Sequence, residues 1–96
     1  MKKGYVLLQI NVNDPEVFKK YPELSEKIIS KFGGKYLFRG GEFEVLEGSW
    51  DFKRNVLLEF ENISKAQEWY NSSDYQEALK IRSNSATSNL IIIEGY

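Results

Sequence analysis

The strictest pattern in the chain is an alternation of side chains near its start, which is followed at once by a helix-start signal. Between Tyr5 and Asn13, every second residue is aliphatic: Val6, Leu8, Ile10 and Val12. A period of two is typical of a β-strand with one buried face. The next residues, DPE at 14–16, predict a helix N-terminus, because Asp14 can cap the helix and Pro15 needs no N–H partner in the first turn. The chain therefore begins with a strand that leads directly into a helix.

The remaining segments continue this order and predict an α+β fold. The first helix is expected to reach Phe32, with a kink or a restart at Pro22. Strands are predicted over residues 35–39, 42–48, 55–61 and 89–95, and further helical segments start at Ser64 and within residues 71–74, before a polar loop at 83–88. The order strand, helix, strands, helix, strand is that of a ferredoxin-like βαββαβ sandwich, in which both helices cover one face of an antiparallel sheet.

Length and composition limit the classes of function. The 96 residues suit a single domain over 1–96, and a hydrophobic fraction of 42% favours a packed core. The chain has no cysteine and no histidine, which removes the commonest metal ligands and general bases, so we expect no metal site and no cofactor. Its net charge is −1 and no basic block occurs, so we expect neither a nucleic-acid partner nor a membrane partner. A cytoplasmic location follows as the default.

The second face of the predicted sheet has a mixed polarity. In the first strand Tyr5, Leu7, Gln9 and Asn11 point away from the helices. By the same alternation, Leu57 with Glu59 and Leu37 with Arg39 are expected to share this face. Such a surface is too apolar to lie bare in water and too polar to be an ordinary core. We therefore expect a homodimer in which two sheets pack face to face.

The string RGGEF at residues 39–43 has two interpretations. Its glycines could cradle a phosphate, and diguanylate cyclases carry a similar string with one more acidic residue before the phenylalanine. They could instead turn one strand onto the next, because glycine adopts a positive φ without a steric cost. The chain is too short for a cyclase domain, and no suitable carboxylate pair stands nearby. We therefore predict a hairpin turn at Gly40 and Gly41.

Five residues are candidates for a ligand site, and each also has a purely structural explanation. Arg39 and Glu59 are expected on neighbouring strands, where the guanidinium could bind a carboxylate or enolate with Glu59 as partner or base. The alternative is a plain cross-strand ion pair. Trp50 lies in a loop and could cover either a planar ligand or a partner subunit. Trp69 and Tyr75 could line a cleft between helix and sheet, although two core aromatics are the simpler explanation.

Several segments together resemble a known family. DPEVFKKY (14–21), FGGKYLFRGG (32–41), VLEGSW (45–50), VLLEFEN (56–62) and WYNSSDYQ (69–76) are similar to domain-of-unknown-function family 1330, in order and over nearly the whole chain. The resemblance implies a ferredoxin-like fold of the dimeric α/β-barrel group, which includes cofactor-free monooxygenases, haem-dependent enzymes, isomerases and ligand sensors. Pro22 departs from the family pattern. The resemblance therefore implies a fold and a dimer, but no single activity.

Two classes of function remain open on these grounds. In the first, each protomer binds a small, partly apolar anion in a pocket between sheet and helices, with or without cofactor-independent catalysis. In the second, the protein is a structural or interaction module with no ligand of its own. A solvent-accessible pocket lined by Arg39, Glu59 and an aromatic ring would favour the first class. A sealed dimer interface that buries the same side chains would favour the second class.

Overall fold

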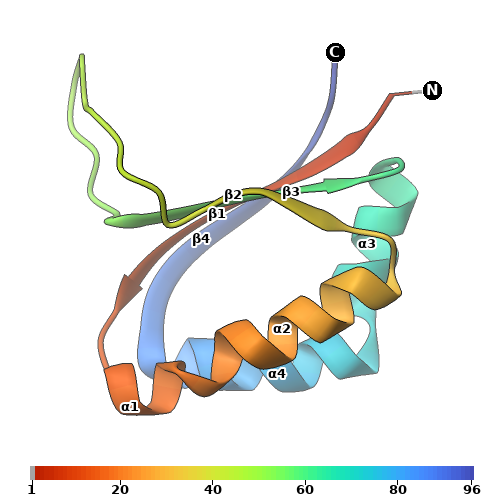
Figure 1. Cartoon of the computed structure of the whole chain (residues 1–96), viewed down its shortest axis with the longest axis horizontal. Coiled ribbons are helices and arrows are strands. Elements are labelled where there is room, and N and C mark those ends of the chain that lie inside the picture. Colours follow the sequence, from red (N-terminus) through yellow and green to blue (C-terminus); the bar gives the residue numbers. More distant parts are fainter. Residues whose placement is uncertain (1) are drawn as a thin grey trace.

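The computed structural model describes residues 2–96 and shows a four-stranded antiparallel sheet with helices on one face (Figure 1). The strands are β1 (Gly4–Val12), β2 (Lys35–Arg39), β3 (Arg54–Phe60) and β4 (Ala86–Glu94), and they lie in the order β2-β3-β1-β4. The helices are α1 (Pro15–Phe18), α2 (Lys20–Lys31), α3 (Ile63–Asn71) and α4 (Ser73–Ser85). This arrangement confirms the predicted ferredoxin-like α+β fold.

Strand β1 organises the core, because it lies inside the sheet and pairs with both β3 and β4. Its residues Val6, Leu8 and Ile10 face the helices and are at most 3% exposed, which confirms the predicted alternation. They belong to one buried cluster with side chains from β3 and from the helical layer, among them Val56, Leu58, Phe60, Phe18, Tyr21, Trp69 and Tyr75. Burying a large apolar side chain stabilises a fold by about 1.5–3 kcal/mol. The sheet is therefore held to its helices by this one face.

The first helical segment restarts close to Pro22, as the sequence predicts. Helix α1 ends at Phe18 and α2 begins at Lys20, so Pro22 lies in the first turn of α2. In that turn a backbone N–H has no partner within the helix, and its absence in proline costs little. The predicted N-cap is also correct, because the Asp14 carboxylate accepts a hydrogen bond from the Val17 N–H at 3.2 Å.

The second helical segment begins at Ile63, one residue before the predicted start at Ser64. Its N-cap is Asn62, whose side-chain oxygen accepts a hydrogen bond from the Lys65 N–H at 2.9 Å. Asparagine and serine are both good N-caps, so residue type alone did not decide between them. Ser72 caps α4 in the same way, and it accepts from the Tyr75 N–H at 3.1 Å, in agreement with the cap predicted within residues 71–74.

The predicted strand over residues 42–48 and its hairpin turn are wrong. Strands β2 and β3 pair directly, and residues 40–53 form a loop that projects from the sheet on the side away from the helices (Figure 1). We call this loop the arm. Gly40 does have a positive φ of 69°, and its N–H donates to the Asn55 carbonyl at 2.8 Å, whereas Gly41 has no positive φ. Gly40 therefore ends β2 and directs the chain into the arm.

The predicted polar loop at 83–88 is also wrong, because α4 continues to Ser85 and β4 begins at Ala86. The polar groups of this segment find partners inside the protein. The Ser85 side chain is fully buried and its hydroxyl donates to the Ile81 carbonyl. Its backbone carbonyl accepts from the N–H groups of Asn13 and Asp14, at 2.7 and 3.0 Å. These bonds join the end of α4 to the end of β1.

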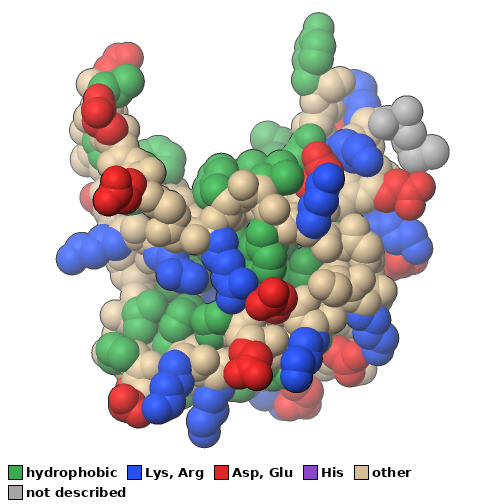
Figure 2. Space-filling model, viewed as in Figure 1, with side chains coloured by type: hydrophobic (Ala, Val, Ile, Leu, Met, Phe, Trp, Pro, Cys, Tyr) green, Lys and Arg blue, Asp and Glu red, His purple; other side chains and the backbone are tan. Residues whose placement is uncertain are grey.

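The face of the sheet opposite the helices, here called the open face, is ordered into rows. Strand register places Phe38, Leu57, Leu7 and Ile91 side by side across all four strands. A second row, of amide side chains, contains Asn55, Gln9 and Asn89. The arm and the C-terminal end rise on either side of this face, and hydrophobic side chains show between them (Figure 2). The predicted mixed polarity is therefore confirmed for β1 and β3.

The positive φ of Gly40 generates a stability prediction. We expect Gly40→Ala to lower the free energy of unfolding by about 1–2 kcal/mol, because a Cβ is strained in the left-handed region. Gly41→Ala is the matched control, since φ is not positive there and no atom lies within 4 Å of the added Cβ. Urea denaturation measures both. Equal losses in the two variants would contradict the role assigned to Gly40.

Candidate functional site

A cleft opens between the helix-covered face of the sheet and the helices. Its free space is small, about 20 Å³, which is room for roughly one water. Its walls are mostly apolar and aromatic, and they come from β1, β2, β3 and the helices. The residues that line it are Leu8, Ile10, Phe18, Tyr21, Pro22, Ser25, Ile29, Tyr36, Arg39, Arg54, Val56, Leu58 and Trp69. This lining contains two guanidinium groups and no carboxylate.

Arg39 reaches the cleft because β2 contains an extra residue. Tyr36 pairs with Leu58 and Phe38 pairs with Leu57, so Leu37 is a β-bulge that has no partner of its own. A bulge of one residue reverses the facing of the side chains that follow it. Arg39 therefore turns to the helix face, where its guanidinium lies 4.5 Å from the centre of the Tyr36 ring.

The predicted pairing of Arg39 with Glu59 is wrong, since the two side chains lie on opposite faces of the sheet. Arg39 instead contacts Glu26 of α2, at 3.3 Å. On the open face Glu59 accepts a hydrogen bond from the Tyr5 hydroxyl at 3.0 Å and pairs with Lys35 at 3.3 Å. The bond from Tyr5 holds the pKa of Glu59 below its ordinary value, and Lys35 adds to the effect. The geometry therefore leaves Glu59 outside the cleft.

Arg54 is the second guanidinium of the cleft, and the sequence analysis missed it. It begins β3 opposite Ile10, and its side chain passes so close to Gly40 that a Cβ there would lie 2.8 Å from Nη1. Gly40 is the sequence signal for this arrangement, because a residue without a side chain at the end of β2 leaves room for Arg54.

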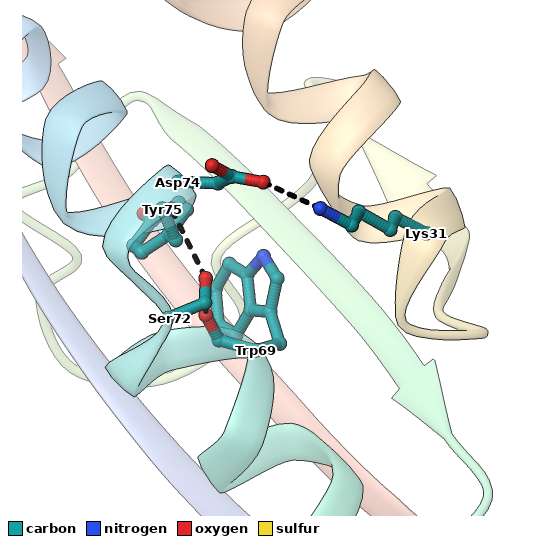
Figure 3. A network of polar contacts seen from close by, with 5 residues as sticks. All are labelled: Lys31, Trp69, Ser72, Asp74 and Tyr75. Atoms are coloured by element: carbon teal, nitrogen blue, oxygen red, sulfur yellow. Dashed lines mark hydrogen bonds and ion pairs between the residues drawn. The ribbon is translucent and has the colours of Figure 1, made fainter.

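Trp69 and Tyr75 are core residues, and Trp69 also forms part of the cleft wall. Both are fully buried, and their ring centres lie 4.2 Å apart. Ser72 fixes the link between their helices, because its hydroxyl donates to the Trp69 carbonyl at 2.8 Å and accepts from the Tyr75 N–H (Figure 3). The Lys31–Asp74 ion pair, at 2.8 Å, joins α2 to α4 beside them. The Trp69 indole N–H has no hydrogen-bond partner among residues 2–96.

A buried polar group lies behind the cleft. The hydroxyls of Tyr21 and Tyr75 are 2.6 Å apart. Arg82 is only 4% exposed, donates to the Ser88 hydroxyl, and lies over the Tyr21 ring at 5.8 Å. Burial raises the pKa of Tyr75 far above its ordinary value, and the neighbouring Tyr21 adds to this while Arg82 opposes it. Tyr75 is therefore neutral at physiological pH.

Trp50 lies apart from the cleft, in the arm. Its indole N–H donates to the Asn55 side chain at 3.1 Å, and about half of the residue is exposed. Together with Leu7, Phe38 and arm residues it lines a hollow of about 590 Å³ on the open face. The five candidate residues thus divide between two places. Arg39 and Trp69 lie at the cleft, Tyr75 lies directly behind it, and Glu59 and Trp50 lie on the other side of the sheet.

The described part of the chain offers little for a metal ion. Across residues 2–96, no three Asp or Glu side chains gather into a group that could hold one. The same residues contain no helix long and apolar enough to cross a membrane. The groups that the cleft can use are therefore hydroxyls, guanidiniums and an indole N–H, all of which favour negative charge on an oxygen.

The separation of Arg39 and Glu59 predicts the outcome of a double-mutant cycle. We expect Arg39→Met and Glu59→Leu to be additive in the free energy of unfolding, within about 0.5 kcal/mol. Arg39→Met with Glu26→Gln should show a coupling of roughly 0.2–1 kcal/mol, the value of a partly exposed ion pair. Chemical denaturation of the single and double variants measures both couplings. A larger coupling to Glu59 than to Glu26 would contradict the assigned facing of Arg39.

Comparisons with known proteins agree with this geometry at the level of the fold. A protein of unknown function from Rhodopseudomonas palustris has a TM-score of 0.81 at 18% identity, over 99% of this chain and 83% of its own. SnoaB, a cofactor-independent oxygenase from Streptomyces nogalater, has a TM-score of 0.67 at 8% identity, over 97% and 92%. A dimeric protein of unknown function with a ferredoxin-like fold, from Bacteroides fragilis, has a TM-score of 0.64 at 14% identity, over 96% and 95%.

The sequence comparisons are more specific about the family. A search of curated proteins found no match. The family described as Domain of unknown function (DUF1330), in contrast, matches residues 3–96, which is nearly the whole chain. Its match covers all four strands and all four helices described above. The chain therefore belongs to the DUF1330 family.

Proposed function

We propose that this protein binds a small, partly apolar anion in the cleft between its sheet and its helices. The observation that carries the proposal is the composition of the cleft lining, in which Arg39 and Arg54 accompany apolar and aromatic side chains and no carboxylate occurs. A ligand site of this kind has apolar walls and a few polar groups that fix orientation. Two guanidiniums select a carboxylate or a similar anion.

The small free space of the cleft sets a condition on this binding. About 20 Å³ holds a water but no organic acid, so a ligand must move side chains at the partly exposed end of the cleft. Arg39 is suited to move, because its side chain is 28% exposed and its partner Glu26 is more exposed still. The enzymatic form of the proposal is a cofactor-independent reaction, since a solved structure of the same fold is described as a cofactor-independent oxygenase.

A structural or interaction module without a ligand is the second candidate. The same narrow cleft favours it, because a pocket filled by its own side chains needs no occupant. A group of exposed apolar residues on the open face and the arm favours it as well, since none of them lines the cleft: Phe38, Phe43, Leu46, Trp50, Ile91 and Ile93. The ligand experiment below separates the two candidates.

We propose that a second copy of the chain covers the open face in either case. The row Phe38, Leu57, Leu7 and Ile91 gives an apolar strip across the whole sheet, with Ile91 and Phe38 51% and 44% exposed. Amide side chains both donate and accept, so the row of Asn55, Gln9 and Asn89 can pair with a two-fold copy of itself. The related fold from Bacteroides fragilis is described as dimeric, which supports the same assembly here.

The dimer proposal predicts that one charge in the apolar row separates the protomers. We expect wild type to sediment as a dimer at tens of micromolar, with more than ~1,000 Å² buried, and Leu7→Glu to sediment as a monomer. Leu24→Glu is the control, because Leu24 is an exposed leucine on α2, away from the open face. Sedimentation equilibrium measures all three. A monomeric wild type, or a dimer that survives Leu7→Glu, would contradict the proposal.

The ligand proposal predicts a specific pattern of thermal stabilisation. A screen of small aliphatic and aromatic carboxylic acids should raise the melting temperature of wild type, because a ligand that binds only the folded state stabilises it. Arg39→Ala should lose most of this increase and still sediment as a dimer. Lys20→Ala, at an exposed lysine of α2 that does not line the cleft, should keep it. If no acid stabilises wild type, the module without a ligand is the better description.

A further inference from the structure

The buried hydroxyl pair behind the cleft has two protons but only one hydrogen bond between its members. Tyr21 and Tyr75 are 5% and 0% exposed, and their oxygens are 2.6 Å apart, so one hydroxyl donates to the other. The neighbouring Arg82 guanidinium lies 5.8 Å from the centre of the Tyr21 ring and carries donors only, so it can accept neither proton of the pair.

Whichever hydroxyl donates, the proton of the other has no acceptor. Neither hydroxyl has a further hydrogen-bond acceptor among residues 2–96. Tyr21 lines the cleft, whereas Tyr75 and Arg82 do not. An acceptor in the cleft therefore favours the arrangement in which Tyr75 donates to Tyr21 and Tyr21 donates to that acceptor. Arg82 is buried without a carboxylate partner in the described chain, and its positive charge makes the Tyr21 hydroxyl a stronger donor.

Trp69 supplies a second donor to the same space. Its side chain is fully buried and lines the cleft, and its indole N–H has no partner in residues 2–96. Buried polar groups are nearly always paired, because a buried donor without an acceptor destabilises the fold. A ligand that offers an acceptor to this indole N–H would remove that cost. A hydroxyl and an N–H thus lack acceptors in the part of the cleft formed by buried residues, while Arg39 and Arg54 line its more exposed part.

We propose that the ligand carries a second oxygen acceptor, a carbonyl or enolate oxygen, which receives hydrogen bonds from the Tyr21 hydroxyl and the Trp69 indole N–H. This inference rests on the proposed function and narrows its ligand class to small oxo acids, whose carboxylate lies at Arg39 and Arg54. Tyr75 is a positioning residue in this scheme. It donates its proton to the Tyr21 oxygen when Tyr21 donates to the ligand, and it does not touch the ligand.

Matched pairs of acids test the inference. 4-Oxopentanoate and pentanoate, like 4-formylbenzoate and 4-methylbenzoate, differ mainly in the second oxygen. We expect wild type to bind the oxo acid of each pair roughly 3- to 10-fold more tightly, the effect of a neutral hydrogen bond. Tyr21→Phe should abolish this preference and Tyr75→Phe should reduce it. Arg39→Ala should weaken both members of a pair equally and leave the preference unchanged.

The control variant and a spectroscopic signal complete the design. Tyr70→Phe removes a hydroxyl whose ring also packs on Tyr75, 5.7 Å away, but which does not line the cleft, and it should keep the preference. The chain has two tryptophans, so Trp50→Phe assigns the Trp69 indole N–H in an NMR spectrum. That signal should shift with the oxo acid and much less with its partner. Titration calorimetry measures the affinities.

Each outcome decides one of the two proposals. Binding of the acids without any preference for the oxo acid, or a preference that survives Tyr21→Phe, would overturn the donor pair and leave the anion cleft intact. A failure of all four acids to bind wild type would overturn the proposed function and this inference with it. A preference confined to proteins that retain Tyr21, together with a shifted Trp69 signal, supports the oxo-acid ligand.

Discussion

The rest of the structure depends on strand β1, which lies inside the sheet between β3 and β4. It pairs with β3 and β4 along nearly its whole length, so its two sets of side chains fix what lies on each face. One set is aliphatic and is buried by the helices, and this burial is the main contribution to the core. A chain of 96 residues supplies only one layer of helices. The opposite face must therefore be either polar or covered, and its apolar row makes it a surface that needs a cover.

Arg82 shows how the interior tolerates a charge that no carboxylate balances. Removing an isolated ion from water costs several kcal/mol, and such groups persist only where hydrogen bonds replace the lost water. Here the Ser88 hydroxyl accepts from the guanidinium, which lies over the face of the Tyr21 ring. The same contacts join the helical layer to β4. The positive charge of Arg82 is therefore stabilised within the fold. Its electric field also reaches the cleft, because no carboxylate in the cleft lining cancels it.

The fold could be predicted from the sequence because its signals are local and repeated. Alternation in β1, the cap at Asp14 and the cap at Ser72 depend on residues a few positions apart. The site could not be predicted in the same way. Leu37 looks like an ordinary strand residue, and only the register with β3 shows that it is a bulge. Because of this one inserted residue, Arg39 faces the cleft and not its expected partner, Glu59. A period-two pattern cannot reveal such a shift, because it assumes that no residue is inserted.

The base of the arm connects the open face of the sheet with the cleft on its helix side. Asn55 accepts from the Gly40 N–H through its carbonyl and from the Trp50 indole through its side chain, so it holds both ends of the arm. Its neighbour Arg54 lines the cleft and passes directly beside Gly40. A change in the path of the arm therefore acts first on Arg54, through the space that Gly40 leaves open. The arm lies on the open face and the Arg54 guanidinium lies in the cleft. The adjacent residues Arg54 and Asn55, at the start of β3, therefore link the two sides of the sheet.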